Sequence, residues 1–186
     1  MPAHNPFVFF KRFLAHPVAV GAVLPTSLQT ARIMADPANP NGTILEMGAG
    51  TGSITQGILE HIKDPKNLTS VEIDPDLAEE FKKNFPNVKL VVGDVEEVLR
   101  SGQKYDAIIS GIPFSVMEAE KKKRIYDLIS IKLNPGGVFV AIQYSLVSKK
   151  ELGERFKHVD IKFSPLNAPP AFVYVCREPV IQPVHA

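Results

Sequence analysis

From residue 42 onward, short runs of β-branched and apolar residues alternate with segments of helical spacing. Runs of this length are typical of buried strands, and helices placed between them favour a parallel sheet with right-handed crossovers. We therefore expect an α/β fold. The predicted strands are residues 43–47, 68–73, 88–92, 105–110, 138–144, 159–163 and 171–176, and the predicted helices are 53–61, 75–84, 95–100, 118–133 and 148–156.

The last two predicted strands are separated only by residues 164–170, which leaves no room for a helix. Parallel neighbours need a long crossover connection, so these two strands must pair antiparallel, as a hairpin. Seven strands that finish in a hairpin depart from the plain dinucleotide-binding pattern. Because 186 residues suffice for one substantial core, we assign residues 37–180 to one domain and residues 1–36 to amphipathic and lid helices of the same domain.

The composition gives no sign of an oxidising or membrane-spanning setting. The net charge is +1, and the single cysteine, Cys176, excludes an internal disulfide and is expected to be a buried small side chain. No apolar run approaches the roughly 20 residues that cross a bilayer, and the N-terminus lacks a secretory signal pattern. Five histidines are scattered without metal-ligand spacing, so no metal is expected.

A glycine-rich turn follows the first predicted strand, with Gly48, Gly50 and Gly52 at alternate positions. Glycine is needed where the backbone takes a positive φ or where a ligand lies against the main chain. In the dinucleotide fingerprint the third glycine comes one position later, where this chain has Ser53. The Glu46 carboxylate would repel a diphosphate but suits a ligand that bears an ammonium and a sulfonium. The turn therefore predicts S-adenosylmethionine rather than a dinucleotide.

Acidic residues end the next two predicted strands. Glu72 lies 20 residues after Gly52, the spacing at which a strand-end acid accepts hydrogen bonds from ribose hydroxyls. Asp74 is better placed as the N-cap of the following helix. Asp94 is expected to accept from the adenine amine while the Val95 amide meets a ring nitrogen, although Asp94 alone also fits an N-cap. All these groups follow consecutive strands, at the edge where open α/β sheets bind ligands.

Together these residues resemble the class I methyltransferases, over about residues 21–177. The resemblance implies the Rossmann-like fold of that class, a seven-stranded, mostly parallel sheet with a C-terminal antiparallel hairpin. It also implies the cofactor contacts, namely Gly48, Gly50 and Gly52 around the methionine moiety, Glu72 and its neighbour Ile73 at the ribose, and Asp94 and Val95 at the adenine.

The segment after the fourth predicted strand bears on the methyl acceptor. Residues 110–114, Ser-Gly-Ile-Pro-Phe, resemble the Asn-Ile/Leu-Pro-Tyr/Phe motif of the ribosomal RNA adenine dimethylases. In that family the Asn side chain and the adjacent carbonyl bind the adenine amine, and the aromatic residue stacks on the base. Ser110 occupies the Asn position but is shorter and lacks the amide. RNA adenine N6-methylation is therefore an alternative function, and a non-catalytic S-adenosylmethionine-binding module is a second.

A closer resemblance is to the bacterial phospholipid N-methyltransferases, which convert phosphatidylethanolamine to phosphatidylcholine. The matching stretches are residues 20–27, 45–52, 110–113 and 168–171. The resemblance implies that Thr26 and Ser27 lie over the cofactor, but both fit equally well as caps of a helix at residues 28–34. We accordingly expect S-adenosylmethionine-dependent N-methylation of phosphatidylethanolamine. No nucleic acid partner is expected.

The N-terminal segment supports a lipid acceptor. In a helix over residues 6–15, the apolar side chains fill an arc of roughly 160°, with Lys11 and Arg12 on the other side. Such a helix can lie in a bilayer interface, although this face can also pack on the sheet or cover the active site. We expect a cytoplasmic protein, peripheral on the inner face of the membrane. The residues expected to touch the membrane are Phe7, Phe10, Lys11, Arg12, Phe13 and Leu14.

Tyr144 and Ser110 are the candidate catalytic residues, and Ser110 is also expected to contact the cofactor. Tyr144 ends the fifth predicted strand, where its hydroxyl or ring can orient the acceptor amine, and a ring face tolerates cationic methylated products. Tyr144 can equally be a tyrosine that closes the core. The basic run at residues 121–124 is interpreted as a solvated helix face rather than as a sensor of anionic lipid.

Overall fold

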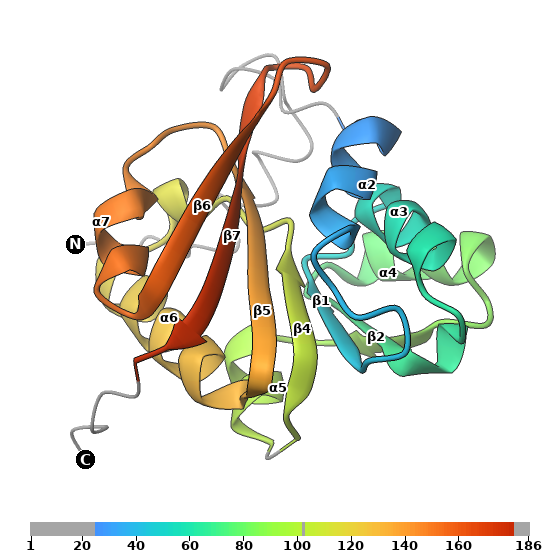
Figure 1. Ribbon diagram of the computed structural model, residues 1–186. Helices are drawn as coiled ribbons and strands as arrows, with labels where there is room; N and C mark the ends of the chain where they lie inside the picture. The colour runs from blue at the N-terminus through green and yellow to red at the C-terminus, as the bar shows by residue number, and fades with distance from the viewer. Residues whose placement is uncertain (1–24, 102, 181–186) are drawn as a thin grey trace, which may run out of the picture.

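The computed structural model describes residues 25–101 and 103–180 (Figure 1). In that part of the chain, seven strands form a single sheet with helices on both faces. The strands are β1 (Ile44–Met47), β2 (Leu68–Glu72), β3 (Lys89–Val92), β4 (Tyr105–Ser110), β5 (Leu133–Gln143), β6 (Phe156–Ser164) and β7 (Ala171–Pro179). The helices are α2 (Leu28–Ala35), α3 (Ser53–His61), α4 (Pro75–Asn84), α5 (Val95–Arg100), α6 (Ala119–Lys132) and α7 (Ser148–Gly153), with short 3₁₀ turns η2 (Pro65–Asn67) and η3 (Phe114–Val116).

The strand order is β3-β2-β1-β4-β5-β7-β6. The pairs from β3 to β5 are parallel, and β7 lies antiparallel between β5 and β6. This arrangement confirms the predicted mostly parallel sheet and its terminal hairpin. The direction in which successive strands are added reverses beside β1, between β2 and β4. Open α/β sheets bind their ligands at such a switch point, beyond the carboxyl ends of the strands.

The boundary between α6 and β5 differs from the prediction. The sequence predicted a helix to residue 133 and a strand from residue 138, whereas β5 already begins at Leu133. The pairing of β4 with β5 shifts register between Tyr105 and Ala107, so that residues 134–137 form a bulge. The Asn134 amide donates to Asp106 (2.8 Å), which holds the bulge against β4. Likewise, α7 is shorter than predicted because β6 already begins at Phe156.

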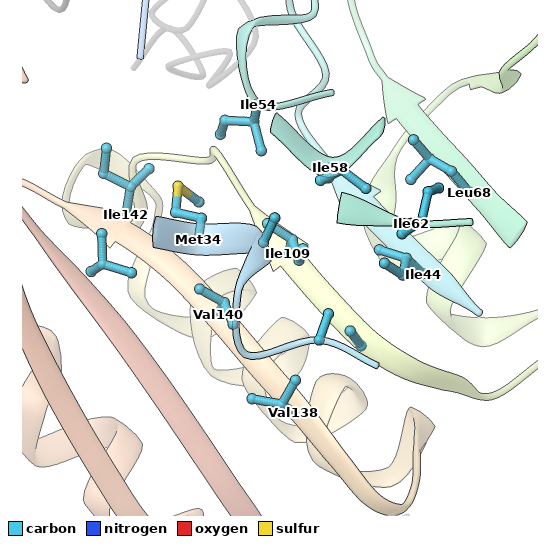
Figure 2. Packing of buried hydrophobic residues seen from close by; sticks show 14 of the residues in the cluster. Met34, Ile44, Ile54, Ile58, Ile62, Leu68, Ile109, Val138, Val140 and Ile142 are labelled. Atoms are coloured by element: carbon cyan, nitrogen blue, oxygen red, sulfur yellow. The ribbon is translucent and has the colours of Figure 1, made fainter. Parts of the chain in front are cut away.

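Alternate strand residues enter two separate cores. Ile44 of β1 faces the side covered by α2, α3 and α4, and its neighbour Leu45 faces the side covered by α5, α6 and α7. Figure 2 shows Met34 of α2 and Ile58 of α3 directed at the strands that carry Ile44 and Ile109. The near-continuous apolar strands are explained by this three-layer arrangement, because each central strand is buried on both faces.

Helix α2 joins the domain through close packing on α3. An added Cβ at Gly57 of α3 would lie 2.6 Å from the Ala31 carbonyl carbon, so a glycine is required where the two helices touch. The N-terminal segment predicted to meet the membrane, including Phe7, Phe10 and Leu14, lies outside the described residues. Among the residues that are described, no helix is long and apolar enough to cross a membrane. Cys176 is buried, as predicted, and burial raises the pKa of its thiol to about 12.

Candidate active site

The glycine turn after β1 is held against the end of β2. The amides of Gly48 and Ala49 both donate to the Val71 carbonyl, at 2.9 and 3.0 Å. The backbone is left-handed at Gly50 (φ 55°) and at Gly52 (φ 94°). An added Cβ at Gly52 would lie 2.0 Å from a carbon of the Phe85 ring, so any larger residue there would force the ring to move. The sequence prediction that this turn needs glycine is confirmed.

Glu72 connects this turn to the beginning of α4. Its Oε2 accepts from the Gly50 amide (2.7 Å), and its Oε1 accepts from the Asp74 amide (2.9 Å). Glu72 is 2% exposed; burial raises the pKa of its carboxyl, and the backbone bonds from Asp74, Gly50 and Ile73 oppose the shift. Asp74 caps α4, as predicted, by accepting from the Asp76 and Leu77 amides. The predicted ribose contact of Glu72 would use the second lone pair that each oxygen retains.

Glu46 lies beneath the turn rather than on its surface. The side chain is fully buried, and its oxygens accept hydrogen bonds from the hydroxyls of Thr55 (2.7 and 2.9 Å) and Ser70 (2.5 Å). The expectation that this carboxylate faces a cationic ligand is corrected, because α3 and β2 supply its partners. Burial raises the pKa of Glu46 to about 7, although the hydrogen bonds from Ser70 and Thr55 oppose the rise; the Glu72 charge makes a smaller contribution in the same direction as burial. We assign Glu46 a positioning role between β1, β2 and α3.

Substitution of Glu46 by glutamine tests this role through pH. The folded carboxyl keeps its proton to about pH 7, whereas the unfolded one ionises near 4.5, so the folded state binds more protons between these values. The free energy of unfolding of the wild type should therefore fall as pH rises through this window, by about 3 kcal/mol from this group. Glu46→Gln should lack this pH-dependent loss of unfolding free energy, because glutamine does not titrate. The serine and threonine hydroxyls can both donate and accept, so they can still bond the glutamine amide.

Urea unfolding of both proteins at about pH 5 and about pH 8 measures the difference. All other titrating groups are shared, and those other than the coupled Glu72 cancel when the two pH dependences are subtracted. Equal pH dependence in the two proteins would contradict the protonated state of Glu46.

Asp94 lies two residues after the end of β3 and is the N-cap of α5, the role that the sequence analysis left open. Its Oδ1 accepts from the Glu96 amide (2.8 Å), and its Oδ2 pairs with the Lys121 Nζ (2.5 Å). The Val95 amide is at the first turn of α5, where N–H groups have no partner within the helix. The predicted adenine contacts of Asp94 and Val95 stay predictions. The basic run is more than a solvated face, because Lys121, Lys122 and Arg124 pair with Asp94, Glu151 and Glu96.

Two glycines leave the main chain uncovered at this edge of the sheet. No described atom lies within 4 Å of the position of a Cβ at Gly50 or at Gly93, although Gly48 and Gly52 are crowded by Ile112 and Phe85. Crowding inside the turn and space outside it are what a ligand lying along the main chain needs. The residues at the ends of β1, β2 and β3 therefore fit an adenosyl ligand.

The loop after β4 has a fixed shape. The Ser110 hydroxyl accepts from the Ile112 amide (3.2 Å), and Gln143 at the end of β5 donates its amide to the Ile112 carbonyl (2.9 Å). Ser110 is fully buried. It therefore shapes this loop and does not lie on the surface as a direct catalytic or cofactor contact, which corrects that expectation. Gln143 escaped sequence analysis because it is a single polar residue within the predicted strand 138–144 and belongs to no motif.

One asparagine connects segments that are distant in sequence. Asn167, in the connection from β6 to β7, accepts from the Ser27 amide at Oδ1 (3.1 Å) and donates to the Pro169 carbonyl (2.9 Å). The Asn167 side chain also interacts with Tyr144 and lowers its pKa, against the larger rise caused by burial. Sequence analysis missed Asn167, since a single asparagine in a proline-rich turn has many ordinary roles.

The two hydroxyl residues before α2 take different positions. Ser27 is the N-cap of α2 and accepts from the Thr30 amide (3.2 Å), so the capping alternative is confirmed for Ser27. Thr26 precedes it and is half-buried. Its position over the cofactor stays a prediction. In the described ranges, no group of three His, Cys, Asp or Glu side chains is placed to hold a metal ion.

Comparison with known proteins agrees with this geometry. An ornithine lipid N-methyltransferase of Singulisphaera acidiphila is 29% identical over 182 residues, which cover 92% of this chain and 95% of the relative. A probable ribosomal RNA small subunit methyltransferase A of Pyrobaculum islandicum is 38% identical over 79 residues, only 41% of this chain and 32% of the relative. The solved N-methyltransferase NodS of Bradyrhizobium japonicum, in complex with S-adenosyl-L-homocysteine, superposes with a TM-score of 0.68 at 16% identity, covering 95% of this chain and 100% of that chain.

The fold and the edge formed by β1, β2 and β3 define a class I methyltransferase. A family described as a methyltransferase domain matches residues 44–137, half of the chain, and the protein belongs to that family. Its methyl donor is S-adenosylmethionine, which supplies an electrophilic methyl group on a sulfonium. The residues that would hold it are the glycine turn, Glu72 with Ile73, and Asp94 with Val95.

Proposed function

We propose that this chain transfers methyl groups to the primary amine of a membrane lipid headgroup, with phosphatidylethanolamine as the acceptor. The observation that carries the proposal is the similarity to a lipid N-methyltransferase over 95% of the relative's length. That similarity extends beyond residues 44–137 into the segment that follows β5, one of the two segments where the acceptor is expected. The relative's name specifies ornithine lipid, and ornithine shares a primary amine with ethanolamine.

The acceptor side of the site suits an amine that needs orientation rather than a strong base. An ammonium has no lone pair, so the headgroup must react as the neutral amine. Burial raises the pKa of Tyr144, so its hydroxyl stays protonated at neutral pH and does not supply a phenolate. A protonated hydroxyl can accept an N–H from the amine and so direct its lone pair. Asn167 would fix the position of that hydroxyl.

Removal of the Tyr144 hydroxyl should slow methylation without weakening the binding of the cofactor. For Tyr144→Phe we expect kcat to fall about tenfold, the effect of one hydrogen bond realised in the transition state. The dissociation constant of S-adenosylmethionine should stay unchanged by calorimetry. Tyr105→Phe is the matched control, because Tyr105 is buried at the opposite end of the sheet, where β4 begins. Equal kcat values for Tyr144→Phe and the wild type would remove Tyr144 from the reaction.

The N-terminal segment is proposed to hold the enzyme at the cytosolic face of the membrane. Replacement of Phe7, Phe10 and Leu14 by serine removes most of the apolar arc predicted from sequence. We expect the variant to stop sedimenting with liposomes while it still binds S-adenosylmethionine. Sedimentation at the wild-type level would show that the segment is not an interfacial helix.

The acceptor itself is tested by methyl transfer to defined lipids. The chain is incubated with S-adenosylmethionine labelled in the methyl group and with vesicles containing either phosphatidylethanolamine or ornithine lipid, and the lipids are then separated. Label in phosphatidylethanolamine supports the proposal. Label only in ornithine lipid would mean that the acceptor is a lipid amine but that the headgroup is ornithine rather than ethanolamine. Label in neither lipid, together with label in added ribosomal RNA, would replace the proposal with the RNA alternative.

A further inference from the structure

Four large apolar side chains are exposed near the carboxyl end of β5. Leu146 and Val147 lie between β5 and α7, and Phe163 and Leu166 lie at the end of β6 and in the turn that follows. Their exposed fractions range from 51% to 69%. Isolated exposed apolar residues are ordinary, whereas several at one end of a molecule mark an interaction surface. We call these four residues the apolar tip.

Contacts between the two segments bring the apolar tip together. Phe163 pairs with Phe172 across the hairpin, and Phe172 pairs in turn with Gln143 at the end of β5. The ring centroids of Phe163 and Phe172 lie 5.5 Å apart. On the same face of β7, the Tyr174 hydroxyl donates to the Ser145 carbonyl (2.9 Å), which fixes the loop of Leu146 beside the hairpin. Figure 1 shows the β6–β7 hairpin extending past the ends of β4 and β5.

The charge pattern around the apolar tip selects its partner. Residues 163–176 contain no charged side chain, and neither do residues 144–148. Lys149 and Lys150 follow directly on α7; both are exposed and make no ion pair with a described residue. An uncharged apolar projection with cations at its border matches a bilayer interface, in which apolar groups enter the acyl boundary and cations meet phosphates.

We propose that the apolar tip docks on an anionic lipid bilayer, with Lys149 and Lys150 at the phosphate level. The proposal rests on the proposed lipid acceptor, and it adds a second contact besides the N-terminal segment. Docking at this place serves the reaction, because Tyr144 lies immediately before the loop that would enter the interface. The headgroup amine would then reach the carboxyl edge of the sheet without complete extraction of the lipid.

The test compares vesicle binding of surface variants that leave the cores intact. The full chain carrying Phe163→Ser and Leu166→Ser is sedimented with vesicles of phosphatidylethanolamine and phosphatidylglycerol. Its partition coefficient should fall about tenfold or more below the wild type. Val180→Ser is the matched control, since Val180 is also exposed but lies beyond β7 at the opposite end of the sheet. The control should bind as the wild type does.

The charged border is tested in the same assay. Lys149→Glu with Lys150→Glu should weaken binding to the anionic vesicles about tenfold or more, and salt should weaken the wild type. Lys104→Glu is the control, because Lys104 is exposed at the other end of the sheet, before β4. Calorimetry with S-adenosylmethionine and thermal unfolding establish that each variant is folded.

The outcomes separate this proposal from the proposed function. Less than about threefold loss for the folded Phe163→Ser, Leu166→Ser variant would overturn the docking surface. So would a change from dimer to monomer in analytical ultracentrifugation with unchanged vesicle binding, which would assign the tip to a second copy of the chain. If the wild type binds the vesicles but methylates no amino lipid, the docking surface is retained and the proposed lipid acceptor is refuted.

Discussion

Gly52→Ala is expected to lower the free energy of unfolding by about 2–5 kcal/mol and to abolish measurable binding of S-adenosylmethionine. Two separate costs add up. A left-handed backbone costs a residue with a Cβ about 1–2 kcal/mol, and overpacking costs about 1–3 kcal/mol. Both apply at Gly52, where φ is 94° and the new Cβ would lie 2.0 Å from the Phe85 ring. Urea unfolding and calorimetry measure the two effects.

The two costs are separated by companion variants. Gly136→Ala places a Cβ on a residue with a φ of 77° but with no described atom within 4 Å, and it lies far from the site in the β5 bulge. It should show only the backbone cost, with cofactor affinity unchanged. Phe85→Leu combined with Gly52→Ala should recover part of the lost stability, because the ring is removed. Wild-type stability of Gly52→Ala would refute the contact with Phe85.

Glu72→Ala is expected to weaken S-adenosylmethionine binding by about tenfold or more. A buried hydrogen bond to a charged acceptor contributes roughly 1.5–3 kcal/mol, and the ribose would lose its acceptor. The turn would also lose its support, since the Gly50 and Asp74 amides would both be left without their carboxylate partner. Calorimetry with S-adenosylmethionine provides the measurement.

An exposed glutamate on the next helix provides the control for Glu72. Glu79 of α4 pairs with Lys83 at the surface, so Glu79→Ala removes the same atoms without touching the turn. Its affinity for the cofactor should equal that of the wild type. Unchanged affinity in Glu72→Ala would count against the whole cofactor site, because the glycine turn and the end of β2 meet at this carboxylate.

Much of the fold is determined by short-range patterns, which explains why it could be predicted. The spacing of apolar residues, the spacing of glycines and the helix caps are all local features. The helices α3, α4 and α5 accordingly have the predicted bounds, and Asp74 is the predicted cap of α4. The antiparallel hairpin also followed from local information, because the length of a connection limits how its strands can pair. The cofactor could also be predicted, because a glycine turn, Glu72 and Asp94 follow three successive strands along the chain.

The failures concern partners that are distant in sequence. Glu46 seemed to face a ligand because nothing near it in the chain indicates that Ser70, 24 residues away, supplies a hydroxyl. Asn167 could not be chosen before the fold placed it against Ser27, 140 residues away. The β5 bulge depends on Asn134 and Asp106. Such contacts follow from tertiary packing, and no local propensity encodes them.

The border position of β6 has a consequence for how copies of the chain meet one another. An edge strand presents unpaired backbone groups that can join the sheet of a neighbour. Here the strand carries Lys157, Asp160 and Lys162, all exposed and spread along its length. Charged side chains on an edge oppose fibrous stacking. Copies of the chain at high concentration should therefore resist joining edge to edge through β6.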